Sequence, residues 1–202
     1  LEGEPEQGGR EEGRRDGERG AHGSALARVL HPIEAEVEGI EDRVRFRDFR
    51  EGRRDIKVST SRDFRHWTEP EWLEFPQAPE EHLYTNAVMP YYRAPHLLVG
   101  FPTRYLPQRD SLTEGLFMSS RDGRTFQRWP EAFLRPGLNR DKWHNRSNYI
   151  WWGLVETQSP LPGGGRELSL YVNEGYYFES QAARTRRYTC RIDGFVSLHA
   201  SF

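Results

Sequence analysis

The feature that most constrains the fold is a turn motif that occurs twice. Ser61–Trp67, with the sequence Ser-Arg-Asp-Phe-Arg-His-Trp, recurs in altered form over Ser120–Trp129. Each copy follows a short run in which apolar and polar residues alternate, as in a β-strand. The Ser or Asp side chain of such a turn can bond nearby backbone N–H groups, and the Trp can pack below the following strand. In strand-rich sequence, the spacing between the two copies, from Ser61 to Ser120, is typical of the blades of a β-propeller. The alternative is two unrelated hairpins.

From residue 55 onward, short alternating runs separated by Gly and Pro predict many short strands. Ile56–Thr60 and Leu168–Val172 alternate with period two, as strands with one buried face do. Asp193-Gly194 predicts a two-residue hairpin turn between strands over Arg187–Ile192 and Phe195–Leu198. The sequence therefore predicts an all-β fold.

The first 54 residues differ from the rest in composition. Residues 1–23 are almost wholly Gly, Glu, Arg, Asp and Gln, so they bury too little apolar surface to offset the entropy of ordering. In residues 24–54, a short apolar patch is followed by Val44, Phe46 and Phe49 among charged residues, a pattern that also allows an edge strand. We expect a disordered or weakly structured leader over 1–54 and the β-domain over 55–202.

The charge balance excludes several classes of partner. With 29 basic and 31 acidic residues the net charge is −2, so no global field attracts the chain to nucleic acid or to an anionic membrane. No apolar run approaches the roughly 20 residues that span a bilayer. The single cysteine, Cys190, excludes an internal disulfide and a zinc site with several thiolate ligands. We expect neither nucleic acid nor a membrane as a partner.

A strand that ends in Ser-x-Asp before an aromatic residue, and recurs along the chain, resembles the five-bladed β-propeller glycosidases of glycoside hydrolase families 32 and 43. The resemblance covers residues 55–202, where Tyr84–Tyr91, Gly115–Gly123 and Trp152–Thr157 are similar to successive blade segments. That family closes its ring with five blades, and this stretch is long enough for about three. We therefore expect an incomplete propeller in a piece of a longer chain, with open sheet edges that allow self-association.

The resemblance implies a carbohydrate partner and glycoside hydrolysis, which needs two carboxyl groups beside the scissile bond. Glu156 ends the uncharged stretch Tyr149–Val155, where burial would raise its pKa toward that of a proton donor. Glu114 and Asp110 are the candidates for the second carboxylate, with solvated loop charges as the alternative for both. Asn86 stands where an acid is expected, which favours a non-catalytic carbohydrate-binding propeller as the alternative function and a protein-interaction scaffold as the next.

The segment Trp143–Tyr149 combines aromatic faces with planar hydrogen-bonding groups, the combination that binds sugars. The alternative is a capped loop in which Arg146 pairs with Asp141 or Glu156. The seven histidines are scattered, so we expect no zinc centre. The resemblance allows a structural calcium ion as the only cofactor. The residues expected to contact sugar are Arg146, His144, Asn148, Trp143, Asn86 and Arg104.

Overall fold

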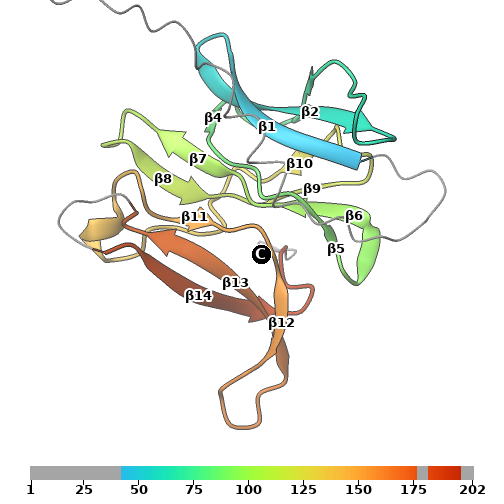
Figure 1. Ribbon diagram of the computed structural model, residues 1–202. Helices are drawn as coiled ribbons and strands as arrows, with labels where there is room; N and C mark the ends of the chain where they lie inside the picture. The colour runs from blue at the N-terminus through green and yellow to red at the C-terminus, as the bar shows by residue number, and fades with distance from the viewer. Residues whose placement is uncertain (1–41, 177–181, 197–202) are drawn as a thin grey trace, which may run out of the picture. The chain divides into compact units, whose positions relative to one another are not determined.

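Antiparallel β-sheets dominate the computed structural model, which describes residues 42–176 and 182–196 (Figure 1). The first of its four sheets has the strand order β1-β2-β3, with β1 at Asp42–Arg50, β2 at Arg53–Ser61 and β3 at Glu71–Trp72. The only regular helical segment in the described residues is a single 3-10 turn over Arg140–Lys142. Within that part of the chain, no helix has the length and apolar character needed to cross a membrane. The all-β prediction is confirmed.

The second sheet has the order β4-β7-β8, and the third has the order β10-β9-β6-β5. Their strands alternate along the chain: β4 (His82–Leu83), β5 (Met89–Tyr91), β6 (Ala94–Gly100), β7 (Thr103–Leu106), β8 (Leu112–Gly115), β9 (Met118–Ser120) and β10 (Gln127–Arg128).

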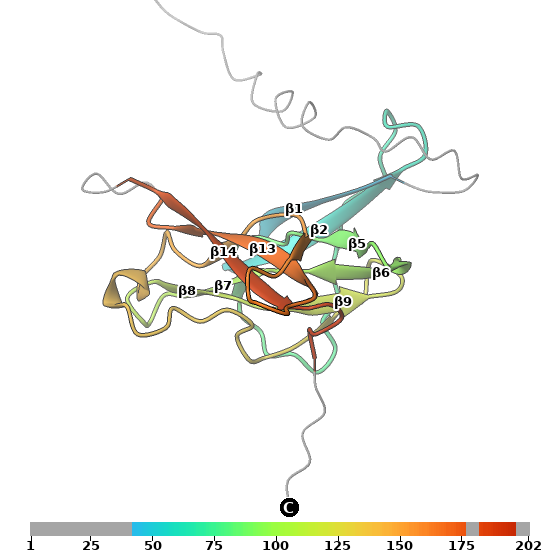
Figure 2. The same ribbon diagram turned by 90° about the horizontal axis from the view of Figure 1, so that it is seen from below.

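These two sheets continue one another. The pair Thr103 and Gly115 of β7–β8 has the same register as the pair Leu98 and Ser120 of β6–β9. Between them, the Leu116 N–H donates to the Pro102 carbonyl at 2.8 Å, while Pro102 has no N–H to donate in return. Figure 2 shows β7 and β8 leading into β6 and β9. Residues 82–128 therefore form one four-stranded meander.

The fourth sheet is built around β13, a long strand with partners on both edges. On one edge β13 pairs with β11 and β12, and on the other with β14. The strands are β11 (Tyr149–Ile150), β12 (Val155–Gln158), β13 (Arg166–Glu174) and β14 (Arg184–Arg191). The described chain is thus a succession of three meanders, and the first strand of each lies at a sheet edge.

The central meander contributes to two apolar clusters. Leu116 belongs to a cluster with Ile56 of β2, and Phe117 belongs to a second cluster with Leu170 of β13. Because successive side chains of an extended chain point to opposite faces, these neighbours pack in different cores. The central meander is therefore packed between the first and the fourth sheets, an arrangement that fixes all three meanders relative to one another.

Both copies of the repeated turn have the predicted chemistry. In each, the Asp carboxylate, of Asp63 or Asp122, accepts backbone hydrogen bonds of 2.7–2.8 Å from the residues two and three positions later. The serine that begins each copy pairs with the residue six positions on, which is Trp67 in one copy and, by the β9–β10 register, Phe126 in the other. Phe126 is therefore the structural equivalent of Trp67, and the alignment on Trp129 was wrong.

The folded region begins earlier than we expected. β1 pairs with β2 along its full length, from Asp42 opposite Ser61 to Arg50 opposite Arg53, so the edge-strand alternative is confirmed. The expected boundary between residues 54 and 55 falls inside β2. Residues 1–41, the rest of the expected leader, lie outside the described residues.

The hairpin expected across Asp193-Gly194 is not formed in its described part. The turn itself is present, with Asp193 at φ 61° and the Gly194 N–H donating to the Arg191 carbonyl at 3.0 Å. Phe195, however, leaves the sheet and stacks on Phe117, with ring centroids 5.0 Å apart. This ring packs in the core, and the outer edge of β14 stays unpaired within the described residues. Residues 197–198 lie outside the described residues.

Candidate functional site

An open pocket of about 580 Å³ lies where the first strands of the three meanders meet. Arg47 comes from β1, Tyr84–Ala87 lie between β4 and β5, and Tyr149–Trp152 begin the last meander. Asn173 of β13 and Tyr176, two residues beyond that strand, complete the lining. We call it the aromatic pocket, and it is lined by Arg47, Tyr84, Thr85, Asn86, Ala87, Tyr149, Ile150, Trp151, Trp152, Asn173 and Tyr176.

Aromatic rings form much of this pocket. The ring of Tyr149 meets Tyr84 at 5.6 Å and Tyr176 at 5.3 Å, both edge to face. Trp151 and Trp152 are more than half exposed, and Trp152 Nε1 donates to the Val88 carbonyl at 2.8 Å. Packed tyrosines and exposed indoles offer apolar faces with polar edges, the surface on which the C–H faces of a sugar ring pack.

The polar groups of the pocket include a guanidinium, two amides and the hydroxyls of Thr85 and the three tyrosines. The Arg47 guanidinium lies 4.2 Å from the Tyr84 ring centre, and its hydrogen bond is the largest cause that lowers the pKa of Tyr84. Burial raises the pKa values of Tyr149 and Tyr176. The side-chain oxygen of Asn173 is buried and accepts no hydrogen bond from the described residues. This oxygen is shielded from solvent, so it does not face the open part of the pocket.

Glu156, the expected proton donor, does not line the aromatic pocket. It lies on β12, where Tyr92 Oη donates to its Oε2 at 2.6 Å and Arg166 Nε donates to its Oε1. The hydrogen bond from Tyr92, followed by that from Arg166, lowers its pKa. The expectation that burial would raise this pKa was wrong, because two donors stabilise the ionised carboxylate.

The two candidates for the second carboxylate differ in burial: Glu114 is buried and Asp110 is exposed. Glu114 on β8 is buried and accepts hydrogen bonds from Arg104, at 2.6 Å from Nη2 and 3.2 Å from Nε. Arg104 also binds Glu81 at 2.9 Å, and Glu81 binds Arg128 at 2.6 Å. Asp110 is exposed in the turn between β7 and β8. Glu114 and Arg104 are thus partners in a buried ion network, and no described contact joins Glu156 to Glu114 or Asp110.

Asn148 holds the predicted binding loop against the central meander. Its side chain is buried, and its Nδ2 donates to the carbonyls of Thr113 at 2.9 Å and Lys142 at 3.0 Å. Its backbone adopts φ 63°, in the left-handed region that asparagine tolerates better than most residues. These contacts give Asn148 a structural role.

The other predicted residues of this loop lie outside the lining of the aromatic pocket. Trp143 is 53% exposed and its Nε1 donates to the Gly137 carbonyl at 2.8 Å. His144 Nδ1 lies 2.5 Å from the Asn145 carbonyl. The Arg146 carbonyl accepts the Tyr176 N–H at 2.9 Å, which connects this loop to the pocket lining. Of the nine predicted site residues, only Asn86 lines the aromatic pocket.

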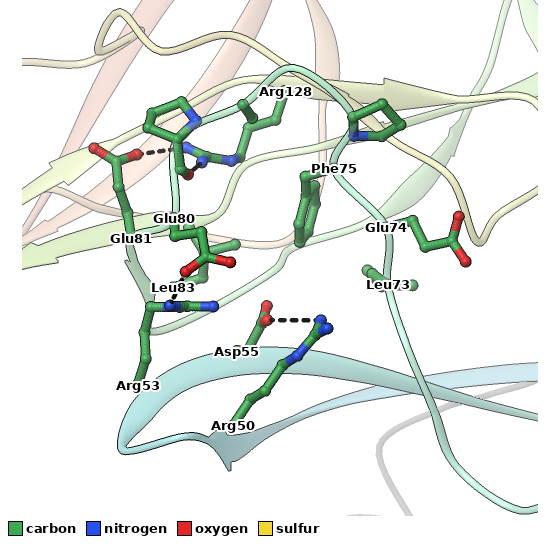
Figure 3. Close-up of a pocket in the computed structure, with 13 residues that line it drawn as sticks. Arg50, Arg53, Asp55, Leu73, Glu74, Phe75, Glu80, Glu81, Leu83 and Arg128 are labelled. Atoms are coloured by element: carbon green, nitrogen blue, oxygen red, sulfur yellow. Dashed lines mark hydrogen bonds and ion pairs between the residues drawn. The ribbon is translucent and has the colours of Figure 1, made fainter.

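A second, charged pocket of about 350 Å³ contains a buried acid (Figure 3). Asp55 lies on β2 with its carboxyl 3.8 Å from Arg50 Nη1, and burial is the largest effect on its pKa, which is raised. Figure 3 shows this carboxyl pointing toward the space beside the Phe75 ring. The pocket's other acids include Glu80, which is paired with Arg53 at 2.7 Å. Sequence reasoning missed Asp55 because one Asp at a strand start carries no distinguishing signal.

Among the described residues, no three or more His, Cys, Asp or Glu side chains are grouped so as to hold a metal ion. Comparison of the chain with models of known protein families, with curated proteins and with solved structures gave no match. What the protein binds is therefore inferred from the geometry of its own pockets.

Proposed function

We propose that the protein is a carbohydrate-binding protein and that the aromatic pocket is its sugar site. The observation that carries this proposal is the convergence of two exposed tryptophans, three tyrosines and two amide side chains in one open pocket. Its volume of about 580 Å³ is within the range typical of small-ligand sites, which is roughly 300–1,000 Å³. The described lining contains no carboxylate, so the groups it offers suit binding better than acid–base cleavage.

The chemistry of the lining matches the two faces of a sugar. Trp151 and Trp152 present exposed ring surface to the C–H face, and burial of that apolar area supplies most of the affinity. Asn86 offers an amide group for hydroxyls. The Asn86 Nδ2 bond to the Arg45 carbonyl is long, at 3.4 Å, so this amide exchanges a weak contact for a ligand hydroxyl at small cost.

We further propose that the three meanders are blades of an incomplete five-bladed propeller. Two observations support this proposal. Each copy of the repeated turn leads into the edge strand of its sheet, and the first strand of every meander contributes to one common pocket, as strands around a hub would. The outer edges of β1 and β14, unpaired within the described residues, are then the places where self-association would occur.

Two matched tryptophan variants test the sugar site. Trp151 lines the aromatic pocket, Trp143 does not, and both are 53% exposed. Glycans that bind the wild type are identified on an oligosaccharide array and titrated by calorimetry. We expect Trp151→Ala to weaken binding about tenfold, the loss of one stacked ring, and Trp143→Ala to leave it unchanged. Absence of binding to every glycan, or equal losses in the two variants, would refute the proposal.

Glycoside hydrolysis is the second candidate function, and Asp55 is the observation that favours it. A buried carboxyl with a raised pKa, placed in a pocket, has the property required of a general acid. Release of nitrophenol from aryl glycosides by the wild type, by Asp55→Asn and by Glu156→Gln tests this candidate. Turnover lost only in Asp55→Asn supports it, turnover lost only in Glu156→Gln restores the sequence-based assignment, and no turnover by the wild type rejects hydrolysis of these substrates.

A further inference from the structure

Arg47 is the only side chain in the described lining of the aromatic pocket that carries a full charge at neutral pH. It is exposed at the surface of β1, and the Tyr84 ring lies 4.2 Å from its guanidinium carbon. This cation–π contact and the hydrogen bond to Tyr84 hold the guanidinium in place. Because a guanidinium has five N–H donors, others remain for a ligand. The pocket therefore has a positive charge in a fixed position.

The surroundings strengthen this positive charge. Arg54 lies 5.6 Å from the centre of the Tyr84 ring, and the charge of Arg146 acts on Tyr176. Two guanidinium groups outside the lining therefore contribute to the potential at the tyrosine cluster. An anion in the pocket would be attracted by all three arginines.

The acidic neighbours of the lining residues are bound to other cations. Asp48 follows Arg47 on β1, so its side chain points to the opposite face, where it binds Lys57 at 2.7 Å. Glu174 follows Asn173 on β13, is buried, and binds both Lys142 and Arg186. Neither carboxylate neutralises Arg47.

We propose that the sugar bound in the aromatic pocket carries an anionic group, a carboxylate or a sulfate, and that Arg47 binds this group. The inference rests on the proposed function of the pocket. A guanidinium donates two parallel N–H bonds to a planar carboxylate, and sulfate oxygens accept in the same way. The ligand is therefore an acidic sugar with its charge at the β1 side of the pocket.

An array that carries neutral, uronate-containing, sialylated and sulfated oligosaccharides tests the inference. We expect acidic glycans to bind at least about tenfold more tightly than neutral ones, the value of one charge-assisted hydrogen-bond pair. The best acidic binder is then titrated beside its methyl ester or desulfated form, which removes only the charge. Added sodium chloride should weaken the acidic ligand and leave the neutral form unaffected.

Variants of Arg47 assign the effect to this residue. Arg47→Met should remove most of the preference for the acidic form, Arg47→Lys should retain most of it, and Arg109→Met, which changes an exposed arginine outside the pocket, should leave it unchanged. Circular dichroism confirms that each variant is folded. Equal binding of neutral and acidic forms overturns this inference and leaves the sugar site intact, as does an acidic preference that is undiminished in Arg47→Met. Absence of binding to any glycan overturns the sugar site itself.

Discussion

Replacing Glu114 with Gln tests whether this residue, one of the expected catalytic carboxylates, instead stabilises the fold. The side chains of Glu114 and Arg104 are only 10% and 13% exposed, and their closest N–O distance is 2.6 Å. Removing one member of a buried ion pair typically costs about 3–5 kcal/mol, because the other charge is left uncompensated. Arg104 keeps Glu81 at 2.9 Å and the Pro130 carbonyl at 2.8 Å, so part of that compensation survives. We therefore expect a loss of about 2–3 kcal/mol in the free energy of unfolding.

Urea denaturation followed by tryptophan fluorescence measures this loss. With a slope of about 2–3 kcal/mol per molar urea, the midpoint should fall by about 1 M without a change in slope. Asp110→Asn is the matched control, because Asp110 is exposed in the turn of the same hairpin and should change stability by less than about 0.5 kcal/mol. A cycle with Arg104→Met should give a coupling free energy of about 1–3 kcal/mol between Arg104 and Glu114.

One result would refute a structural role for Glu114. If Glu114→Gln unfolds at the same urea concentration as the wild type, the ion pair does not stabilise the domain. If that variant also loses a hydrolytic activity present in the wild type, Glu114 is again the candidate catalytic carboxylate, as expected from the sequence.

Three further variants test separate parts of the structure. Burial opposes ionisation of Asp122, but the turn hydrogen bonds outweigh it and lower the pKa to about 2. The stability that these bonds give to the folded state is therefore present above pH 3.8 and is lost as the pH falls through about 2. Asp122→Ala should therefore cost about 1 kcal/mol at pH 7, after allowance for solvent screening, and much less at pH 2, as two urea titrations would show. Burial raises the pKa of Asp55, so its ionisation destabilises the folded state as the pH rises from 3.8 through the raised value. Asp55→Asn should make the melting temperature less dependent on pH between pH 3 and pH 8. Glu156→Gln should leave glycan binding in the aromatic pocket unchanged in a calorimetric titration. A loss of binding would mean that Glu156 contributes to the binding site.

The parts of the fold that depend on local chemistry could be predicted from the sequence. The Ser-x-Asp turns form because each carboxylate bonds N–H groups two and three residues away, a contact that needs no tertiary structure. Phe64 and Gly123, the fourth residues of the two copies, both adopt a positive φ, at 59° and 79°. The Asp193-Gly194 turn obeys the same local rule, but in the described residues Phe195 stacks on Phe117 and does not continue into a partner strand.

The candidate site was harder to predict, because its chemistry is decided by long-range contacts. The pKa of Glu156 depends on Tyr92, which approaches from the turn after β5, and no property of the strand Val155–Gln158 indicates that donor. The sequence made Glu114 a candidate catalytic carboxylate or a solvated loop charge, whereas it is buried and paired with Arg104 on the neighbouring strand β7. Asn86 was found because it stands in a strand-like segment where the resemblance leads to the expectation of an acid.

Arg47 was missed because the charge-rich composition of residues 24–54 predicts weak structure. Charged residues that alternate with the period of a β-strand can instead form a strand. Arg43, Arg45 and Arg47 alternate along β1 and therefore share one face. Arg43 and Arg45 donate to the carbonyls of Asp122 and Gly123, and Arg47 lies over the Tyr84 ring. One row of guanidinium groups thus ties β1 to the second turn motif and also places a cation in the aromatic pocket. The average composition of residues 24–54 cannot reveal this alternation of arginines, because it occupies only five residues of that segment.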